Sequence, residues 1–138
     1  MSEYISSHLQ TYKDAGWLAD GLANNRYVSG VGTNLLSTII AGAYECGIRD
    51  FDTKTAYEAC LKNELEGKNR PFGAGKVNTT EFVKYGYVPH QDEGEGYHET
   101  FMFSASHTLE YSYSTWAVAQ WAKQLGDCLL YTSPSPRD

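Results

Sequence analysis

The chain has 138 residues, a formal net charge of −6 at pH 7 and 14% aromatic residues. This length suits one domain with a core of its own. The acidic charge argues against a nucleic-acid partner, because phosphate binding needs clusters of Lys and Arg that this sequence lacks. No apolar run reaches about 18 residues, so we expect no membrane span.

The cysteines and the N-terminal residues leave the compartment open. Cys46, Cys60 and Cys128 have no metal-ligand spacing and make no even disulfide set, so we expect buried free thiols. The acidic, Ser-rich start lacks the basic and apolar regions of a signal peptide. We therefore make no prediction of localisation.

The first predicted element is an amphipathic helix over residues 2–15. Ile5 and Leu9 recur at helical spacing, and Gly16 is a typical helix stop. Residues 17–32 are rich in Gly and Asn and show no periodicity, which predicts a loop.

A second helix, predicted over residues 35–45, is apolar nearly all round. It carries no charge before Glu45, and Gly47 ends it, while Thr33 or Asn34 can cap its start. Such a helix is expected to contact neighbours on all sides.

A third helix is predicted to begin at Asp52 or Thr53 and to turn one face toward water. Thr55 followed three residues later by Glu58 also fits a capping box, which leaves the start open by one turn. Its apolar face consists of Tyr57, Cys60, Leu61 and Leu65.

Two further helices follow a Gly-, Asn- and Lys-rich loop at residues 67–78. A short helix is predicted to start at Asn78 and to end near Gly86. Another loop follows Pro89, and the last helix begins near Ser106.

The last helix, which runs to Leu125, is the most informative element. It is apolar on one face and carries mostly Ser, Thr, Gln and Tyr on the other, with no formal charge between Glu110 and Lys123. This pattern is typical of a helix inside a larger helical assembly, where polar groups can point at a ligand. The helices therefore alternate between amphipathic and buried, as the outer and inner helices of an (α/α) toroid do.

Three separated stretches closely resemble the helical catalytic domain of glycoside hydrolase family 92, the calcium-dependent exo-acting α-mannosidases. They are residues 106–125, residues 47–59 and the Tyr-Gly-Tyr-Val-Pro stretch at 85–89, and the resemblance covers residues 1–126 in order. It implies an all-α fold in which this chain is a fragment, a partial (α/α)6 toroid holding about a third of the ring.

The resemblance also implies an activity, the inverting and calcium-dependent removal of terminal α-linked mannose from glycans. An inverting glycosidase needs a general acid and a general base roughly 6.5 to 9.5 Å apart. The family's paired carboxylates and most of its calcium-associated residues belong to motifs C-terminal to this stretch, and those motifs are absent here. We therefore predict no catalytic residue and no metal ligand in this chain, and no activity of the fragment alone.

Residues 127–138 break abruptly from the helical pattern. They contain two Pro within three residues and resemble the translation of a sequencing adapter, so we interpret them as a non-native tail. An ordinary disordered tail is the alternative. Residues 1–126 then form the fragment of the catalytic domain.

Two regions are predicted to contribute to the binding of substrate at the mouth of the toroid. On the last helix Thr108, Glu110 and Tyr113 match the family pattern, and Glu110 near the helix N-terminus also complements the helix dipole. In the family acidic residues follow, whereas this chain has Ser114 and Thr115 and so loses local negative charge.

Asn34 and Trp17 are the candidates of the second region. Many family members carry Gly-Asp-His in the loop that enters the second helix, and Asn34 falls at the Asp. An Asn keeps the hydrogen-bonding capacity and loses the charge. Trp17 is a candidate for stacking on the sugar, with core packing as the alternative.

Other patterns carry less weight, and two further functions stay open. Asp92, Glu93 and Glu95 resemble a calcium loop only in charge, and His98 and His107 are too isolated for a metal pair. The alternatives to a mannosidase are another toroid glycosidase and a non-catalytic helical scaffold that binds protein or glycan.

Overall fold

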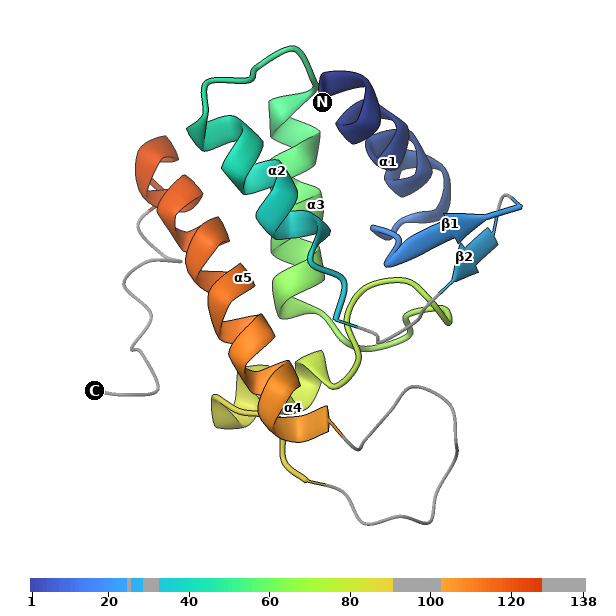
Figure 1. Ribbon diagram of the computed structural model, residues 1–138, viewed down its shortest axis with the longest axis vertical. Coiled ribbons are helices and arrows are strands. Elements are labelled where there is room, and N and C mark those ends of the chain that lie inside the picture. The colour runs from blue at the N-terminus through green and yellow to red at the C-terminus, as the bar shows by residue number, and fades with distance from the viewer. Residues whose placement is uncertain (25, 29–32, 91–102, 128–138) are drawn as a thin grey trace.

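The computed structural model describes residues 1–24, 26–28, 33–90 and 103–127. Within these ranges the fold is all-α apart from one short hairpin, with five helices and a two-stranded sheet (Figure 1). The acidic stretch with Asp92, Glu93 and Glu95, His98 and the predicted tail from residue 128 onward lie outside the described residues.

The main helices alternate in direction. Helices α1 (Ser2–Ala15) and α3 (Thr53–Leu65) run one way, and α2 (Leu36–Glu45) and α5 (Ser104–Leu125) run the other way (Figure 1). Helix α2 packs along α5, and α3 contacts all the other helices, including the short α4 (Thr79–Tyr85). Among the described residues, no helix combines the length and the apolarity needed to cross a bilayer.

Two helix boundaries follow directly from residues identified in the sequence. Gly16 takes a φ of 81° and ends α1, a conformation that costs other residues a steric clash. Asp52 caps α3, because its Oδ1 accepts a hydrogen bond from Thr55 N at 3.1 Å. This cap settles the start of the third helix, which the sequence left open by one turn.

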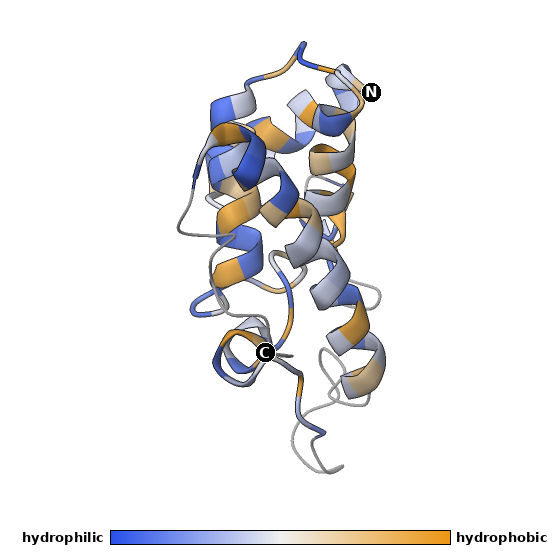
Figure 2. Cartoon of the chain, turned by 90° about the vertical axis from the view of Figure 1, so that its left-hand side faces the viewer, coloured by the Kyte–Doolittle hydropathy of each residue, from blue (hydrophilic) through white to orange (hydrophobic). Residues whose placement is uncertain are grey.

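The core lies between α1, α2, α3 and α5. Ile5, Ile40 and Val118 are fully buried in it, and the ring of Trp121 packs 4.7 Å from that of Tyr44. Figure 2 shows hydrophobic and hydrophilic residues together on each main helix, so that one side of each helix can face the core.

The loop predicted over residues 17–32 contains a hairpin. Strand β1 (Gly21–Ala23) pairs antiparallel with β2 (Arg26–Val28), and Leu22 lies opposite Tyr27. Strands of this length are too short to give a periodic signal, which explains why the sequence did not reveal them.

The two helices predicted to be buried all round are each buried on one side only. On α5, Leu109, Tyr113 and Trp116 are exposed, and on α2 Ile39 is exposed. The buried stripe of α5 consists of His107, Tyr111, Ser114, Val118, Trp121 and Ala122.

The buried face of α3 also differs from the prediction. Leu65 is exposed, whereas Asn63 and Glu64 are buried. The reason is the position of α3 among the other helices, which covers more of its circumference than one apolar stripe would.

The chain continues its contacts just beyond the predicted domain boundary at residue 126. Asp127 Oδ2 accepts a hydrogen bond from Tyr57 OH at 2.8 Å, and Asp127 N donates to Ala122 O at 2.9 Å. Asp127 therefore belongs with the packed helices in the described structure.

Candidate functional site

Asn34 precedes α2, and Thr108, Glu110 and Tyr113 lie in the first half of α5. In Figure 1 the beginning of α2 and the end of α3 lie beside the middle of α5. The segment before the hairpin meets the loop at residues 67–78 there. Asp20 N donates a hydrogen bond to Gly73 O, and Gly75 N donates to Leu18 O, each at 2.9 Å. These bonds join the two loops into one wall.

Trp17 belongs to this wall, and its side chain is mostly covered. Lys62 Nζ lies 4.4 Å from the centroid of the indole, and a Cβ on Gly75 would lie 3.0 Å from the same ring. The carbonyl of Trp17 accepts a hydrogen bond from Tyr27 OH at 3.1 Å. These contacts give Trp17 a packing role, and only 8% of its surface remains exposed to a ligand.

Asn34 ties the loop before α2 to its surroundings. Its Nδ2 donates to Leu18 O at 3.0 Å, and its main-chain N donates to Asp20 Oδ1 at 3.0 Å. Asn63 Nδ2 donates to the Asn34 carbonyl at 3.2 Å. The Asn34 side chain does not cap α2, whose N-cap position is Leu35, and Asn34 Oδ1 has no hydrogen-bond partner among the described residues.

The three candidates on α5 point in different directions. Thr108 Oγ1 accepts a hydrogen bond from Val88 N at 2.9 Å and donates to Ser104 O at 2.7 Å, so it fastens the segment after α4. Glu110 is half-buried, and Tyr113 is exposed beside α2. Their spacing distributes them around the helix, so they do not converge on one point.

A buried ion pair that the sequence analysis missed lies at this end. Lys76 Nζ donates to Glu64 Oε2, and the residues are 1% and 3% exposed. Ser114 Oγ and Thr115 Oγ1 donate to the same carboxylate oxygen, each at 3.0 Å. The loop at residues 67–78 is thereby connected to both α3 and α5.

Burial determines the electrostatics of this cluster. It lowers the pKa of Lys76, while the negative charges of Glu64 and Glu110 act in the opposite direction. Burial also raises the pKa of Tyr111, whose OH donates to Val77 O at 2.6 Å. Tyr111 is therefore a neutral hydrogen-bond donor at physiological pH.

One partner of the ion pair carried a weak signal in the sequence. Glu64 follows Cys60 by four residues and Ala56 by eight, so it continues the buried stripe of α3. Lys76 carried none, because a charged residue in a Gly-rich loop usually points to solvent.

Ser114 and Thr115 stand where the family resemblance has acidic residues. Here their hydroxyl groups donate to Glu64, and an ammonium group neutralises that carboxylate. Among the described residues, no group of three or more His, Cys, Asp or Glu side chains could hold a metal ion.

The buried carboxylate of this cluster is not available for hydrolysis. Glycoside hydrolysis by inversion needs two carboxyl groups that reach the scissile bond and a water molecule. Glu64 is buried and accepts hydrogen bonds from three side-chain groups.

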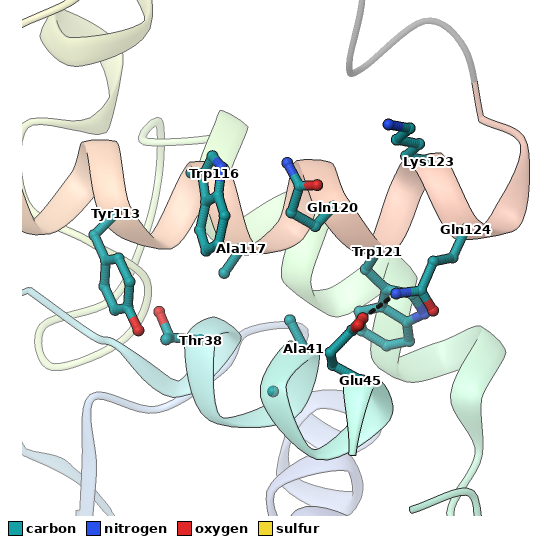
Figure 3. Close-up of a pocket in the computed structure, with 11 residues that line it drawn as sticks. Thr38, Ala41, Glu45, Tyr113, Trp116, Ala117, Gln120, Trp121, Lys123 and Gln124 are labelled. Atoms are coloured by element: carbon teal, nitrogen blue, oxygen red, sulfur yellow. Dashed lines mark hydrogen bonds between the residues drawn. The ribbon is translucent and has the colours of Figure 1, made fainter. Parts of the chain in front are cut away.

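A groove of about 540 Å³ lies between α2 and α5 (Figure 3). The rings of Tyr113 and Trp116 stack on its wall with centroids 6.2 Å apart. In Figure 3 Thr38 of α2 lies opposite Tyr113, and Glu45 lies at the other end of the groove beside Gln124, which donates a hydrogen bond to it. The groove therefore joins one predicted site residue, Tyr113, to residues that the sequence analysis did not select.

Comparison with known proteins supports the resemblance seen in the sequence. The catalytic domain of glycosyl hydrolase family 92 matches residues 1–134, which extends beyond the predicted boundary at residue 126. A protein of Arthroderma benhamiae (strain ATCC MYA-4681 / CBS 112371), described as an "Uncharacterized secreted glycosidase", is 34% identical over 123 residues. The aligned part is 86% of this chain and 16% of that protein, so the chain spans a small part of its relative. The fold is helical and the family match covers nearly the whole chain, so the chain belongs to the catalytic domains of glycosyl hydrolase family 92.

Proposed function

We propose that this chain forms part of the catalytic domain of a longer exo-acting α-mannosidase, which releases terminal α-linked mannose from glycans with inversion. The observation that carries the proposal is the family match over residues 1–134. The relative described as a secreted glycosidase supports a glycosidic substrate, because its aligned segment covers 86% of this chain.

The order of the helices supports a partial (α/α)6 toroid. Helices α1 and α3 run opposite to α2 and α5, as outer and inner helices of such a ring do (Figure 1). In this proposal α2 and α5 are neighbouring inner helices. Helix α2 begins just after Asn34, beside the middle of α5, and the first turns of α5 extend past this point, where loops can reach a sugar (Figure 1).

At this end the proposal gives each candidate residue a role. Asn34 is 1% exposed, so in this proposal it contributes to the sugar site by positioning the loop before α2 through its hydrogen bond to Leu18 O. Glu110 and Tyr113 offer further polar groups, while Thr108 and Trp17 hold the wall in place.

The general acid, the general base and the calcium ligands are proposed to lie on other segments of the longer protein. Glu64 does not supply them, because Lys76, Ser114 and Thr115 already hold its carboxylate. The contribution of this chain is then the supporting wall and part of the surface that faces the sugar.

A chimeric enzyme tests the proposal. The aligned segment of the A. benhamiae glycosidase is replaced by this chain, and hydrolysis of para-nitrophenyl α-mannoside is followed with and without a calcium chelator. We expect calcium-dependent turnover by the chimera, with β-mannose as the first product in proton NMR spectra, and no turnover by the isolated chain.

The controls separate the remaining functions. Turnover by the isolated chain would contradict the proposal that the general acid and the general base lie on other segments of the longer protein. Hydrolysis of a different aryl glycoside by the chimera would favour another toroid glycosidase. A folded chimera that binds mannose-containing glycans and hydrolyses none of them would favour a non-catalytic scaffold. Glu110→Gln in the chimera is expected to weaken the hydrolysis of mannosides.

A further inference from the structure

The hydroxyl group of Ser114 lies where three elements meet, and the residue is completely buried. Lys76 Nζ, from the loop at residues 67–78, donates a hydrogen bond to Ser114 Oγ. Ser114 Oγ donates in turn to Glu64 Oε2 of α3 at 3.0 Å. The loop, α3 and α5 are therefore joined through one side-chain oxygen.

A hydroxyl group suits this place between two charges. The ammonium group of Lys76 can only donate hydrogen bonds and the ionised carboxylate of Glu64 can only accept them, whereas a hydroxyl group does both. The acidic residue that the family resemblance has at position 114 would add a second anion here, and one ammonium group cannot neutralise two. An Ala at this position would remove the bridge and leave the ion pair itself.

The carboxylate of Glu64 is held through one of its two oxygens. Oε2 accepts hydrogen bonds from Lys76, Ser114 and Thr115, whereas Oε1 is buried and has no partner among the described residues. Each donor to Oε2 therefore contributes to the position of the carboxylate. The loss of one hydroxyl group leaves the ion pair in place and loosens the junction between the three elements.

Glu110 lies one helical turn before Ser114 and on the same face of α5, because residues four apart in a helix lie one above the other. Glu110 is half-buried. Burial lowers the pKa of Lys76, and the negative charge of Glu110 is one of those that act against this shift. Glu110 therefore lies on the side of α5 that carries the buried pair, within electrostatic reach of Lys76.

The segment from Lys76 to Val88 supports the first half of α5. In Figure 1 the first turns of α5 extend past the beginning of α2 and the end of α3. Tyr111 OH donates a hydrogen bond to Val77 O at 2.6 Å, and Thr108 Oγ1 accepts one from Val88 N at 2.9 Å. Because Lys76 attaches this segment to α3, the support of these turns depends on the buried junction.

We propose that Ser114 is a positioning residue for Glu110: its bridge between Lys76 and Glu64 holds the first half of α5 in the arrangement in which the Glu110 carboxylate reaches the sugar. Ser114 itself does not touch the substrate, because it is 0% exposed. The inference rests on the proposed function, in which Glu110 offers a polar group to the sugar.

The test removes one hydroxyl group at a time from α5 in the chimera with the A. benhamiae glycosidase. Ser114→Ala is compared with Ser112→Ala, a control whose exposed hydroxyl group donates to Thr108 O within the same helix. We expect Ser114→Ala to raise KM for para-nitrophenyl α-mannoside severalfold and to leave kcat close to that of the parent, because Ser114 acts on binding. Ser112→Ala should retain both values.

A double-mutant cycle with Glu110→Gln separates positioning from a general structural effect. In the Glu110→Gln background, Ser114→Ala should change KM little, because the carboxylate that Ser114 positions is already absent. An equal effect of Ser114→Ala in both backgrounds would overturn the inference. An unchanged KM in the single variant Ser114→Ala would overturn it as well.

Amide hydrogen exchange, measured by mass spectrometry on the folded chimeras, gives a readout that does not depend on activity. Ser114→Ala should accelerate exchange severalfold in the first half of α5 and leave α1 unchanged, whereas Ser112→Ala should match the parent throughout. Equal exchange in the two variants would contradict the role of the bridge. A folded parent chimera without mannosidase activity overturns the proposed function and leaves the exchange test readable.

Thr115→Val keeps the test decisive if Ser114→Ala does not fold. Thr115 Oγ1 donates to the same oxygen of Glu64 at 3.0 Å, and Val has nearly the same shape without the hydroxyl group. We expect Thr115→Val to raise KM in the same way, and Thr115→Ser, which keeps the donor, to retain the KM of the parent. A KM that is raised equally in Thr115→Ser assigns the effect to packing and contradicts the inference.

Discussion

Lys76 and Glu64 form an ion pair that is almost completely removed from solvent, between a loop and helix α3. Helix α5 is attached to this pair, since Ser114 and Thr115 donate to the same carboxylate. A paired charge in the interior is tolerated because the ammonium and hydroxyl groups stabilise the carboxylate through Glu64 Oε2, and removing one partner of the pair leaves the other uncompensated.

Lys76→Met is therefore expected to destabilise the fold by about 3–5 kcal/mol. The control is Lys13→Met, which breaks the exposed 2.8 Å pair with Asp52 and should change stability little. Urea titration at low protein concentration measures both. The double variant Lys76→Met, Glu64→Leu should recover part of the loss, and equal effects of the two lysine variants would contradict the buried pair.

Gly73→Ala is expected to loosen the hairpin from the loop. Gly73 has a φ of 75°, and a Cβ there would lie 2.8 Å from the backbone N of Val28, so we expect a loss of about 2 kcal/mol or more. The control is Gly42→Ala on α2, where a Cβ meets nothing within 4 Å and helix propensity favours Ala by about 1 kcal/mol. The midpoints of urea unfolding should therefore shift in opposite directions.

His8 should make stability depend on pH below neutrality. Burial lowers the pKa of His8 in the folded chain, so the unfolded chain binds the proton more readily. The free energy of unfolding is therefore highest above the unfolded pKa of about 6.5. It decreases as the pH falls from there toward the lower pKa of the folded chain. His8→Gln is expected to flatten the difference in unfolding free energy between pH 7.5 and 5.5. Ser7→Ala, exposed on the same helix, should retain the parent difference. An unchanged difference in His8→Gln would exclude this role.

The cysteines should differ in reactivity. Cys46 is exposed, whereas Cys60 is buried and burial raises the pKa of its thiol, which disfavours the reactive thiolate. In a Cys128→Ser background we expect one rapidly labelled thiol with a disulfide reagent under native conditions. In that background, Cys46→Ser should abolish the rapid labelling, and Cys60→Ser should leave one rapidly labelled thiol. Rapid labelling of two thiols would show that the core opens readily.

The sequence predicted the helices well where a local signal specified them. The stop at Gly16 and the cap at Asp52 act within a few residues, so no distant contact is needed to place them. The expectation of buried free thiols held for Cys60 and was wrong for Cys46, which follows the end of α2 on its exposed side. Burial of a single residue depends on which neighbour reaches it.

The candidate site was less accessible to prediction. Family resemblance selected Asn34, and the structure adds that its side chain bonds to Leu18 O across the chain. It could not select Lys76, because only the folding of the loop brings this residue to Glu64 and Ser114. A buried polar network depends on residues that are distant in sequence, and periodicity carries no information about them.

The sequence by itself determined the helical class, most helix boundaries and the membership of a glycosidase family, because each depends on short-range patterns or on motifs. Only the tertiary structure decided which side of each helix is covered, that Glu64 is neutralised by Lys76, and that a groove remains open between α2 and α5. The physical reason is that burial and pairing are properties of the space between elements, which a chain acquires only when distant segments pack.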